Sequence, residues 1–553
     1  MSKAIARREF LKQLGRGLGF AVGTPFLTDF LLQQLVNRAW AVTTGSATSA
    51  NYIHLSFPGG PPRWYFDLPL TPTGVTSKNF IAGGFGTAFD ANGNVVYKTA
   101  AFKVGGQTVH LPPVWGMGLS RQDFTTLLPN TIFIRGMDME INNHGISNGR
   151  QVAPVVGGIS VTGKLADHSN LPIPGIVDLN TWAGQVFRSY KGLGAASISY
   201  SQKNPAEALL NPFKEFRGNR AAHSALQTRL QAQALEHFER SFASQGGNSG
   251  ALAKMYDNAI QLMDENIISV ASAWDATLAK YKSIMEEAIF PKKGTLPGLF
   301  DRAIPGAASK TATDATSLLY GNGDTAGTKV TGKDIRDMFV PGKTTSARMA
   351  ENFALAELLI GRVTSNMTLA FPALTSLSLD GSEANLFSPN HDQHYMGSRV
   401  SLLATTLFYR AFLGCLTELV ASLKSKGLFD STIIHISSEF NRTPKSSGAG
   451  SDHGYMAGNT TLISGMIGEC GVVGNIKVDG RAETGNSYVG TFGVADNFDL
   501  GGMNRPIQVN DVALTITSML GIDAERVITN GRALLAPSGG RWTLKKKEAK
   551  NNA

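Results

Sequence analysis

The sequence has few cysteines, few charged residues and no long apolar run after its first forty residues. Its 553 residues include only two cysteines, Cys415 and Cys470, which excludes a framework of several disulfides and leaves one bond between them open. Charged residues make up 17% of the chain and hydrophobic residues 42%, which excludes a disordered polyelectrolyte and predicts a folded, glycine-rich globular protein. No uninterrupted apolar run of about 18 residues follows residue 41, so we expect no stable membrane span in the mature chain.

The net charge of +9 is concentrated at the two ends of the chain. Residues 1–41 hold six Lys and Arg against two acids, and Arg541–Lys550 holds five against one. Each end contributes +4, so 9 − 4 − 4 leaves about +1 for the body at 42–540. So small a charge gives no reason to expect a nucleic-acid partner. We interpret 541–553 as a basic solvated tail, with binding of a polyanion by this tail as an alternative.

The first 41 residues have the pattern of an export signal. Paired arginines at 7–8 precede Phe10-Leu11-Lys12, a moderately apolar stretch follows, and Ala39-Trp40-Ala41 offers small residues for cleavage. This pattern resembles a twin-arginine signal peptide. It predicts the twin-arginine translocase as a partner during export and a periplasmic or secreted location in a bacterium. A membrane anchor is the alternative, although Asp29 at the centre of a span would cost about 2.5–3.5 kcal/mol.

Three short apolar runs predict buried strands. They lie at 52–57, 131–137 and 431–437, and the first stops at a cluster of Pro and Gly. Buried strands alternating with helices are typical of a mainly parallel sheet covered on both faces. The sequence lacks a dinucleotide-type glycine motif between strand and helix and a phosphate-binding GxxxxGK[ST] motif, which argues against nucleotide-binding enzymes.

The middle of the chain has helical periodicity. Apolar residues at helical spacing, among them Trp274, Leu278, Tyr281 and Met285, predict a helical insertion at about 205–300. The Gly-, Ala- and Thr-rich segment at about 303–334 predicts an irregular loop. Helical patterning resumes from Ala347. The sequence therefore predicts one α/β domain at 42–540 with a helical insertion.

The stretch "SPNHDQHYMG" places Asp392 close to His394. In an extended segment these two side chains are available to one ion, and carboxylate with imidazole suits zinc, manganese or iron better than magnesium. A hydrogen-bonded polar loop is the alternative.

The stretch "SSEFNRTPKSSGAGSDHGY" follows the third predicted strand and brings several functional groups together. Glu439 comes directly after the strand, where open α/β sheets bind their ligands. Asp452-His453 returns after a glycine-containing loop, and Arg442 is a suitable holder of a phosphate or sulfate group. His435 lies within the strand, where we expect it to be structural.

A third polar segment follows the run at 131–137. It contains Asp138, Glu140, His144 and Ser147. Asp138 or His144 is a candidate ligand or proton carrier, and Ser147 is a candidate nucleophile. The alternative is that these groups cap the start of a helix.

The stretch "GLFDSTIIHISSEFNRTP…SDHGY" resembles a secreted, twin-arginine-exported, sulfatase-like bacterial family, catalogued as a domain of unknown function, within the alkaline phosphatase superfamily. "LSFPGGPPRWYFDLP", "HDQH" and "RPIQVNDVALTITSMLGID" are similar to other parts of that family, so the resemblance covers roughly 50–160 and 345–535. It implies a three-layer α/β/α sandwich with one or two divalent ions, zinc, manganese or calcium, at the carboxyl edge of the sheet.

The resemblance also implies roles for individual residues. Asp392 and His394 match one metal pair, Glu439 matches the acidic member of a second pair, and Asp452-His453 matches a later ligand. The sequence departs from the family at Phe440, where a histidine is usual. It departs again at Tyr65, where an acid is usual, so that Asp67 is the remaining acid nearby. It also has no Cys-x-Pro-x-Arg sulfatase motif.

These expectations define two main hypotheses. The first is an exported, metal-dependent hydrolase of phosphate or sulfate esters that acts on a small anionic substrate, with Arg442, His144 and Ser147 as catalytic groups. Its metal ligands are Asp392, His394, Glu439, Asp452 and His453. The second is a non-catalytic exported binding or assembly protein that keeps the fold without the chemistry.

Overall fold

The computed structural model describes part of the 553-residue chain. The described residues are 50–69, 88–89, 95–96, 99–169, 171, 173–198, 270, 272–289, 348–371, 393, 398–444, 451–477, 494–499 and 504–545. The predicted signal peptide, most of the predicted insertion, the predicted loop at 303–334, and both Asp392 and His394 lie outside them. The chain divides into two compact units: one comprises 1–46, 191–193 and 200–273, and the other comprises 47–190, 194–199 and 274–553.

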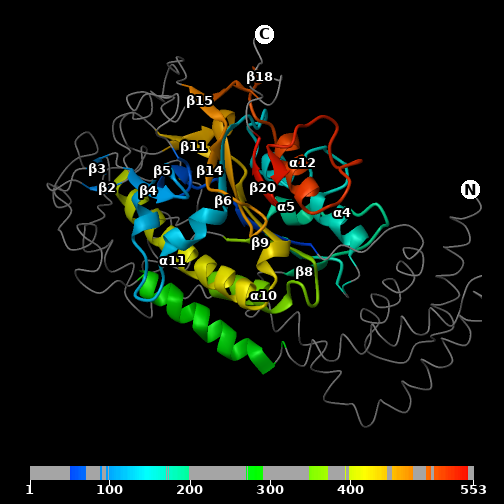
Figure 1. Ribbon diagram of the computed structural model, residues 1–553, viewed down its shortest axis with the longest axis horizontal. Helices are drawn as coiled ribbons and strands as arrows, with labels where there is room; N and C mark the ends of the chain where they lie inside the picture. The colour runs from blue at the N-terminus through cyan, green and yellow to red at the C-terminus, as the bar shows by residue number, and fades with distance from the viewer. Residues whose placement is uncertain are drawn as a thin grey trace, which may run out of the picture. The chain divides into compact units, whose positions relative to one another are not determined.

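An eight-stranded mixed sheet forms the centre of the second unit (Figure 1). Its order is β14 (Gly471–Val473), β6 (Thr131–Met137), β13 (Gly458–Ile463), β10 (Thr432–Ser438), β1 (Asn51–Phe57), β9 (Asn366–Ala370), β7 (Ile176–Asp178) and β8 (Ala196–Ile198). Within this sheet β13 runs antiparallel to β6 and β10, whereas the other neighbours are parallel. The mixed α/β fold and the three predicted strands are confirmed.

Both faces of the central strands are buried, which explains their nearly continuous apolar sequences. All seven residues of β1 are buried, and so are all seven of β10. The strand β1 ends where Pro58 is followed by Gly59 and Gly60, whose φ angles of 103° and 61° favour glycine. This turn starts the loop that leads into the site described below.

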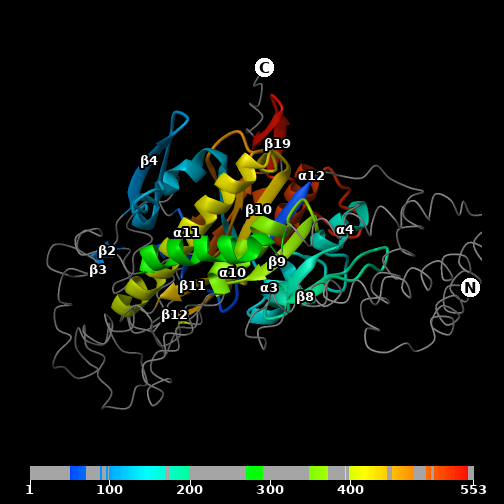
Figure 2. The same ribbon diagram turned by 90° about the horizontal axis from the view of Figure 1, so that it is seen from below.

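Helices lie against the sheet (Figures 1 and 2), and two sets of apolar side chains make the contact. Phe57 of β1 contacts Phe408 and Phe412 of α11 (Ser398–Ser425), with ring centroids 5.7 and 4.8 Å away. Phe353 of α10 (Arg348–Leu359) joins the same group. Elsewhere α4 (Val161–His168) and α12 (Val509–Met519) pack with β6, β10 and β13 in a second cluster.

Two predicted helices are confirmed. The helix expected from Ala347 is α10, which is almost wholly buried. Residues 272–289 are helical, and Trp274, Tyr281 and Met285 are buried on one side. The hydroxyl of Tyr281 donates to Glu357 Oε2 of α10 at 2.6 Å, so the periodic apolar residues here form packing surface.

The described segment Thr405–Ser425 of α11 is long and apolar enough to cross a membrane by length and composition alone. However, 78% of this window is buried inside the protein. We therefore interpret it as a core helix that packs against the sheet.

Shorter elements complete the described fold. Paired short strands are β2 (Ala88–Phe89) with β3 (Val95–Val96), β4 (Ala100–Val104) with β5 (Gln107–Leu111), β11 (Asn441–Pro444) with β12 (Ser451–Gly454), β15 (Asn475–Lys477) with β16 (Val494–Asp496), β17 (Phe498–Asp499) with β18 (Asn504–Arg505), and β19 (Leu535–Ser538) with β20 (Arg541–Leu544). Short helices are α3 (His144–Arg150), α5 (Trp182–Gln185), η1 (Arg63–Tyr65), η3 (Pro113–Gly116), η4 (Phe124–Asn130), η6 (Phe429–Ser431) and η7 (Tyr455–Ala457). The start of the predicted basic tail is thus the ordered strand β20.

Cys415 and Cys470 are both free and buried, so the disulfide left open by the sequence is not formed. Burial raises the pKa of Cys470 to about 12 and also raises the pKa of Cys415. Both thiols therefore behave as small apolar side chains.

Two histidines are buried in the centre of the sheet. His54 on β1 and His435 on β10 are register partners, and both are fully buried. His54 Nε2 contacts Ser437 Oγ at 2.8 Å, while the two ring nitrogens of His435 contact Tyr52 and Thr460 at 2.7 Å. The structural role expected for His435 agrees with this position.

These histidines make stability depend on pH. Burial lowers the pKa of His54 to about 3 and holds the pKa of His435 well below its usual range. The unfolded chain takes up protons near pH 6.5 and the folded chain does not, so stability is fully present above pH 6.5 and falls as the pH drops. We expect the free energy of unfolding to fall by about 1 kcal/mol for each histidine between pH 6.5 and 5.5.

Urea unfolding at pH 7.5, 6.5 and 5.5 measures this dependence. His54→Gln removes one of the two contributions and reduces the slope, whereas His110→Ala on the β4–β5 hairpin leaves it unchanged. A slope unaffected by His54→Gln contradicts the prediction.

Candidate active site

Polar loops meet at one edge of the sheet. The strands β1, β7 and β10 are parallel, and β6 has the same direction because it and β10 both run antiparallel to β13. Their carboxyl ends therefore lie along one edge. Gly59 follows β1, His144 follows β6, Thr181 follows β7 and Glu439 follows β10.

The helix α3 positions His144 as its first residue. Asn143 is the N-cap, and its side chain accepts a hydrogen bond from the backbone N–H of Ile146 at 3.0 Å. This cap ends the loop that follows β6 and fixes where the helix begins. The imidazole of His144 is 27% exposed, so it remains accessible from solvent.

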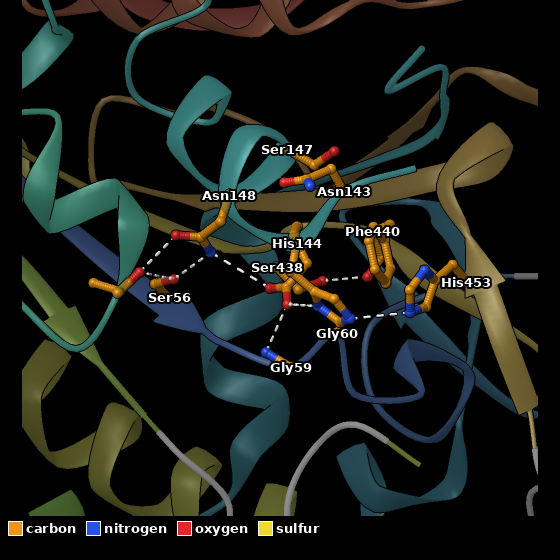
Figure 3. A network of polar contacts seen from close by, with 12 residues as sticks. Ser56, Gly59, Gly60, Asn143, His144, Ser147, Asn148, Ser438, Phe440 and His453 are labelled. Carbon is orange, nitrogen blue, oxygen red and sulfur yellow. Dashed lines mark hydrogen bonds and ion pairs between the residues drawn. The ribbon is translucent and has the colours of Figure 1, made fainter. Parts of the chain in front are cut away.

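A chain of hydrogen bonds joins Glu439, His144 and His453 (Figure 3). His144 Nδ1 lies 2.6 Å from Glu439 Oε1, and His144 Nε2 lies 2.9 Å from His453 Nε2. His453 Nδ1 lies 2.5 Å from the side-chain oxygen of Asn142. The structure thus brings together three of the residues selected from the sequence.

The two imidazoles face each other through their Nε2 atoms, 2.9 Å apart. Each Nδ1 lies beside an oxygen atom, Glu439 Oε1 for His144 and Asn142 Oδ1 for His453. In the tautomer with a hydrogen atom on both Nδ1 atoms, the two Nε2 lone pairs point at each other, and a cation between them removes the repulsion. With the Asn142 amide turned the other way, His453 Nε2 donates to His144 Nε2 and the chain is neutral. The pair of Nε2 atoms is therefore the candidate cation site.

Glu439 is held by groups that follow two other strands, β1 and β6. Its side chain is 2% exposed, and Oε1 also accepts the Gly59 N–H at 2.6 Å. Asn148 Nδ2 lies 3.5 Å from Oε2 and 3.0 Å from Ser56 Oγ. These donors stabilise the carboxylate and fix its direction towards His144.

Phe440 packs against both histidines. Its ring centroid lies 4.7 Å from that of His144 and 4.4 Å from that of His453. A Cβ atom at Gly60 would lie 2.9 Å from this ring, so glycine is required for the approach. Phe440 therefore restricts the orientation of the two imidazoles. The resemblance led us to expect a histidine at this position.

Arg442 and Asp452 make local contacts beside this chain. Arg442 is 1% exposed and donates through Nε to Gly60 O at 2.7 Å and through Nη2 to Gly59 O at 2.6 Å. Asp452 Oδ1 accepts the backbone N–H of His453 at 2.8 Å. In the structure Arg442 thus braces the loop whose Gly59 N–H binds Glu439, and its role towards a substrate anion stays a prediction.

The candidates in the polar segment after β6 make different contacts: Asp138, Glu140 and Ser147 bond within the segment or to Arg150, and His144 bonds to Glu439 and His453. Ser147 is fully buried and its hydroxyl donates to Ile141 O at 2.7 Å, which directs it towards the backbone. Asp138 Oδ1 accepts the backbone N–H of Glu140 at 2.8 Å, and Glu140 pairs with Arg150 at 2.8 Å. Of the four candidates selected in this segment, His144 contacts both Glu439 and His453. A nucleophilic role for Ser147 stays a prediction.

The "HDQH" segment is described only at Gln393. Its backbone oxygen accepts hydrogen bonds from the N–H of Ser451 at 3.2 Å and from the hydroxyl of Ser451 at 2.8 Å. Ser451 begins β12, which carries His453 two residues later. Within the described part of the chain no group of three or more His, Cys, Asp and Glu side chains has metal-binding geometry. Asp392 and His394 therefore stay untested as ligands.

Sequence reasoning missed two asparagines that position this site. Asn142 contacts His453, and Asn148 links Glu439 to the loop after β7, where its Oδ1 accepts from Thr181 Oγ1 at 2.6 Å. The only signal was the run "INNHGISNG", which has three asparagines around His144. Amide side chains are common in loops, so this run did not indicate their contacts.

A family model matches part of the chain. The model of a family described as "Protein of unknown function (DUF1501)" matches residues 382–541. This segment contains Glu439 and His453 but not His144. No curated protein matches the chain.

The resemblance to sulfatases and to the alkaline phosphatase superfamily was wrong. The matching family is DUF1501, and nothing in the comparisons indicates membership of that superfamily. The quoted stretches were short strand, loop and helix patterns. Since buried strands followed by polar loops occur in many α/β folds, such patterns carry little family information.

Proposed function

We propose that this chain is a metal-dependent hydrolase of phosphate or sulfate esters, with the ion bound between His144 and His453. The observation that carries the proposal is the 2.9 Å contact between their Nε2 atoms, while each Nδ1 faces an oxygen acceptor. Histidines that bind metals usually donate their other ring N–H to a carboxylate, a carbonyl oxygen or water. Both histidines have this arrangement.

The residues present suit a transition metal. Two imidazole nitrogens favour zinc or manganese over calcium, which prefers oxygen ligands. When bound, such an ion supplies Lewis-acid stabilisation of an anionic ester oxygen and activates water. Glu439 orients His144 through Nδ1, and Phe440 keeps both rings in place.

The substrate class follows from charge and access. A cation held by neutral histidines attracts an anionic group, and the partly exposed His144 allows a small ester to reach it. Export through the twin-arginine route, a periplasmic or secreted location and a three-layer α/β/α arrangement remain parts of this proposal. Paired arginines at 7–8 support export, and helices packed through two separate apolar clusters support the layers.

Metal analysis of the purified mature protein tests the proposal. We expect about one zinc or manganese ion per chain and turnover of aryl phosphate or sulfate esters. His453→Ala removes one of two facing nitrogens, so we expect metal content and turnover to fall at least 10-fold. His110→Ala, on the β4–β5 hairpin, is the matched control and should keep both.

A non-catalytic binding or assembly protein is the second candidate. It is favoured by the hydroxyl of Ser147 and by Nε and Nη2 of Arg442, which all donate to backbone carbonyls. Unchanged metal content in His453→Ala, together with no ester turnover by the wild type, supports this second candidate and contradicts the first.

A further inference from the structure

An exposed tryptophan lies beside the histidine chain. Trp182 is 49% exposed and begins α5, directly after the loop that leaves β7. Leu179 in the same loop is 43% exposed, and Ile146 on α3 is 45% exposed. Large apolar side chains usually lose most of their exposure on folding. A group of such side chains that stays exposed often marks a binding surface.

The indole of Trp182 covers Gly145. A Cβ atom built at Gly145 would lie 2.6 Å from Nε1 and 2.9 Å from both Cδ1 and Cε2. Cδ1 and Cε2 are the two ring atoms bonded to Nε1. Because both are equally distant from the Cβ position and only slightly farther from it than Nε1, this position lies above the plane of the indole ring. One face of the indole therefore lies on the backbone of Gly145. The 49% exposure of Trp182 then leaves its other face open to solvent.

Contacts on both sides hold Trp182 in this orientation. The neighbouring Thr181 hydroxyl and Ala183 N–H both donate to Asn148 Oδ1, at 2.6 and 2.7 Å. A Cβ atom at Gly184 would lie 2.0 Å from Asp178 O, so α5 packs directly on the end of β7. The backbone that carries Trp182 is thus fixed, and one face of its indole rests on Gly145, which lowers the entropic cost of stacking.

The same contacts connect the aromatic face with the site. Asn148, which anchors both neighbours of Trp182, also contacts Glu439 Oε2. Gly145, which the indole covers, follows His144 directly, and consecutive Cα atoms are about 3.8 Å apart. A ligand whose charged group reaches His144 therefore has an apolar surface next to it.

We propose that Trp182, with the exposed Ile146 on α3 and the exposed Leu179 in the loop before α5, binds an aryl group of the substrate beside the histidine pair. The three exposed side chains are all apolar, which fits an aryl ring better than a polar substituent. This inference rests on the proposed function and adds that the enzyme selects aryl esters over small alkyl esters.

Calorimetric binding of phenylphosphonate and methylphosphonate to the metal-loaded protein tests the inference. These two probes carry the same charged group and differ in the ring. We expect the wild type to bind phenylphosphonate about 3- to 10-fold more tightly. Trp182→Ala should make the two affinities equal, and Trp182→Phe should keep most of the preference. Tyr190→Ala is the control, because Tyr190 is 59% exposed and contacts Arg526.

The outcomes separate this inference from the proposed function. An equal preference in wild type and Trp182→Ala overturns the aryl subsite, whether or not esters are hydrolysed. A preference that Trp182→Ala abolishes, in a protein that hydrolyses no ester, supports the subsite and overturns the hydrolase. Failure of the wild type to bind either phosphonate overturns both.

Discussion

Glu439→Gln is expected to lower ester turnover about 10²- to 10⁴-fold and metal affinity about 10- to 100-fold. Glutamine has nearly the same shape, but it carries no charge to orient and polarise His144 through Nδ1. It also weakens the acceptor for the Gly59 N–H. Turnover of an aryl phosphate and metal titration of the apo-protein measure the two effects. Near-wild-type circular dichroism would show that the fold is kept.

Glu140→Gln is the matched control for this substitution. Glu140 lies in the loop after β6, its side chain is 46% exposed, and it pairs with Arg150. We expect turnover within about twofold of the wild type, because exposed ion pairs contribute little. Glu439→Gln with turnover within threefold of wild type would contradict a role for Glu439 in the site.

Asp67→Ala is expected to destabilise the protein by about 3–5 kcal/mol. Arg63 and Asp67 form an ion pair whose side chains are both 0% exposed, and Arg63 Nε donates to Asp67 Oδ1 at 2.6 Å. Asn459 and Thr461 also donate to the carboxylate, at 3.0 and 2.6 Å. Removing the carboxylate leaves a guanidinium buried without its counter-charge. The free energy of unfolding in urea measures this loss.

The double variant Arg63→Met with Asp67→Leu separates lost charge from lost packing. Because it removes both charges, we expect it to recover most of the stability lost in Asp67→Ala. Glu525→Ala at the exposed Arg526–Glu525 pair should change stability by less than about 0.5 kcal/mol. A double variant no more stable than Asp67→Ala would contradict an electrostatic origin of the loss.

The strands and helices that the sequence predicted share one property. Apolar runs such as 131–137 and the periodic residues around Tyr281 report burial directly, since burial depends on the local pattern of side chains. The antiparallel direction of β13 could not be predicted, because "GNTTLI" has no feature that distinguishes it from a parallel strand. Direction depends on connections between distant parts of the chain.

The candidate site was predicted as residue types, not as contacts. The position of Glu439 after a buried strand placed it at the correct edge, and His453 and His144 were selected for their polar neighbours. The 2.9 Å contact between the two imidazoles joins residues 309 positions apart, and no local pattern encodes it. The resemblance placed Tyr65 and Asp67 where a family acid is usual. In the structure both are buried beside Arg63, and Asp67 forms an ion pair with it.

The position of β1 in the sheet has a consequence for biosynthesis. This strand is the first of the sheet to be translated, yet its two neighbours, β9 and β10, begin at residues 366 and 432. The ribosome adds roughly 5–20 residues per second, so β1 waits about 20–75 s for β10. Both of its hydrogen-bonding edges are unpaired until β9 is made, and the edge that pairs with β10 stays unpaired for the rest of that interval, which favours aggregation. The nascent chain is therefore expected to depend on a holding chaperone until residue 438 has left the exit tunnel.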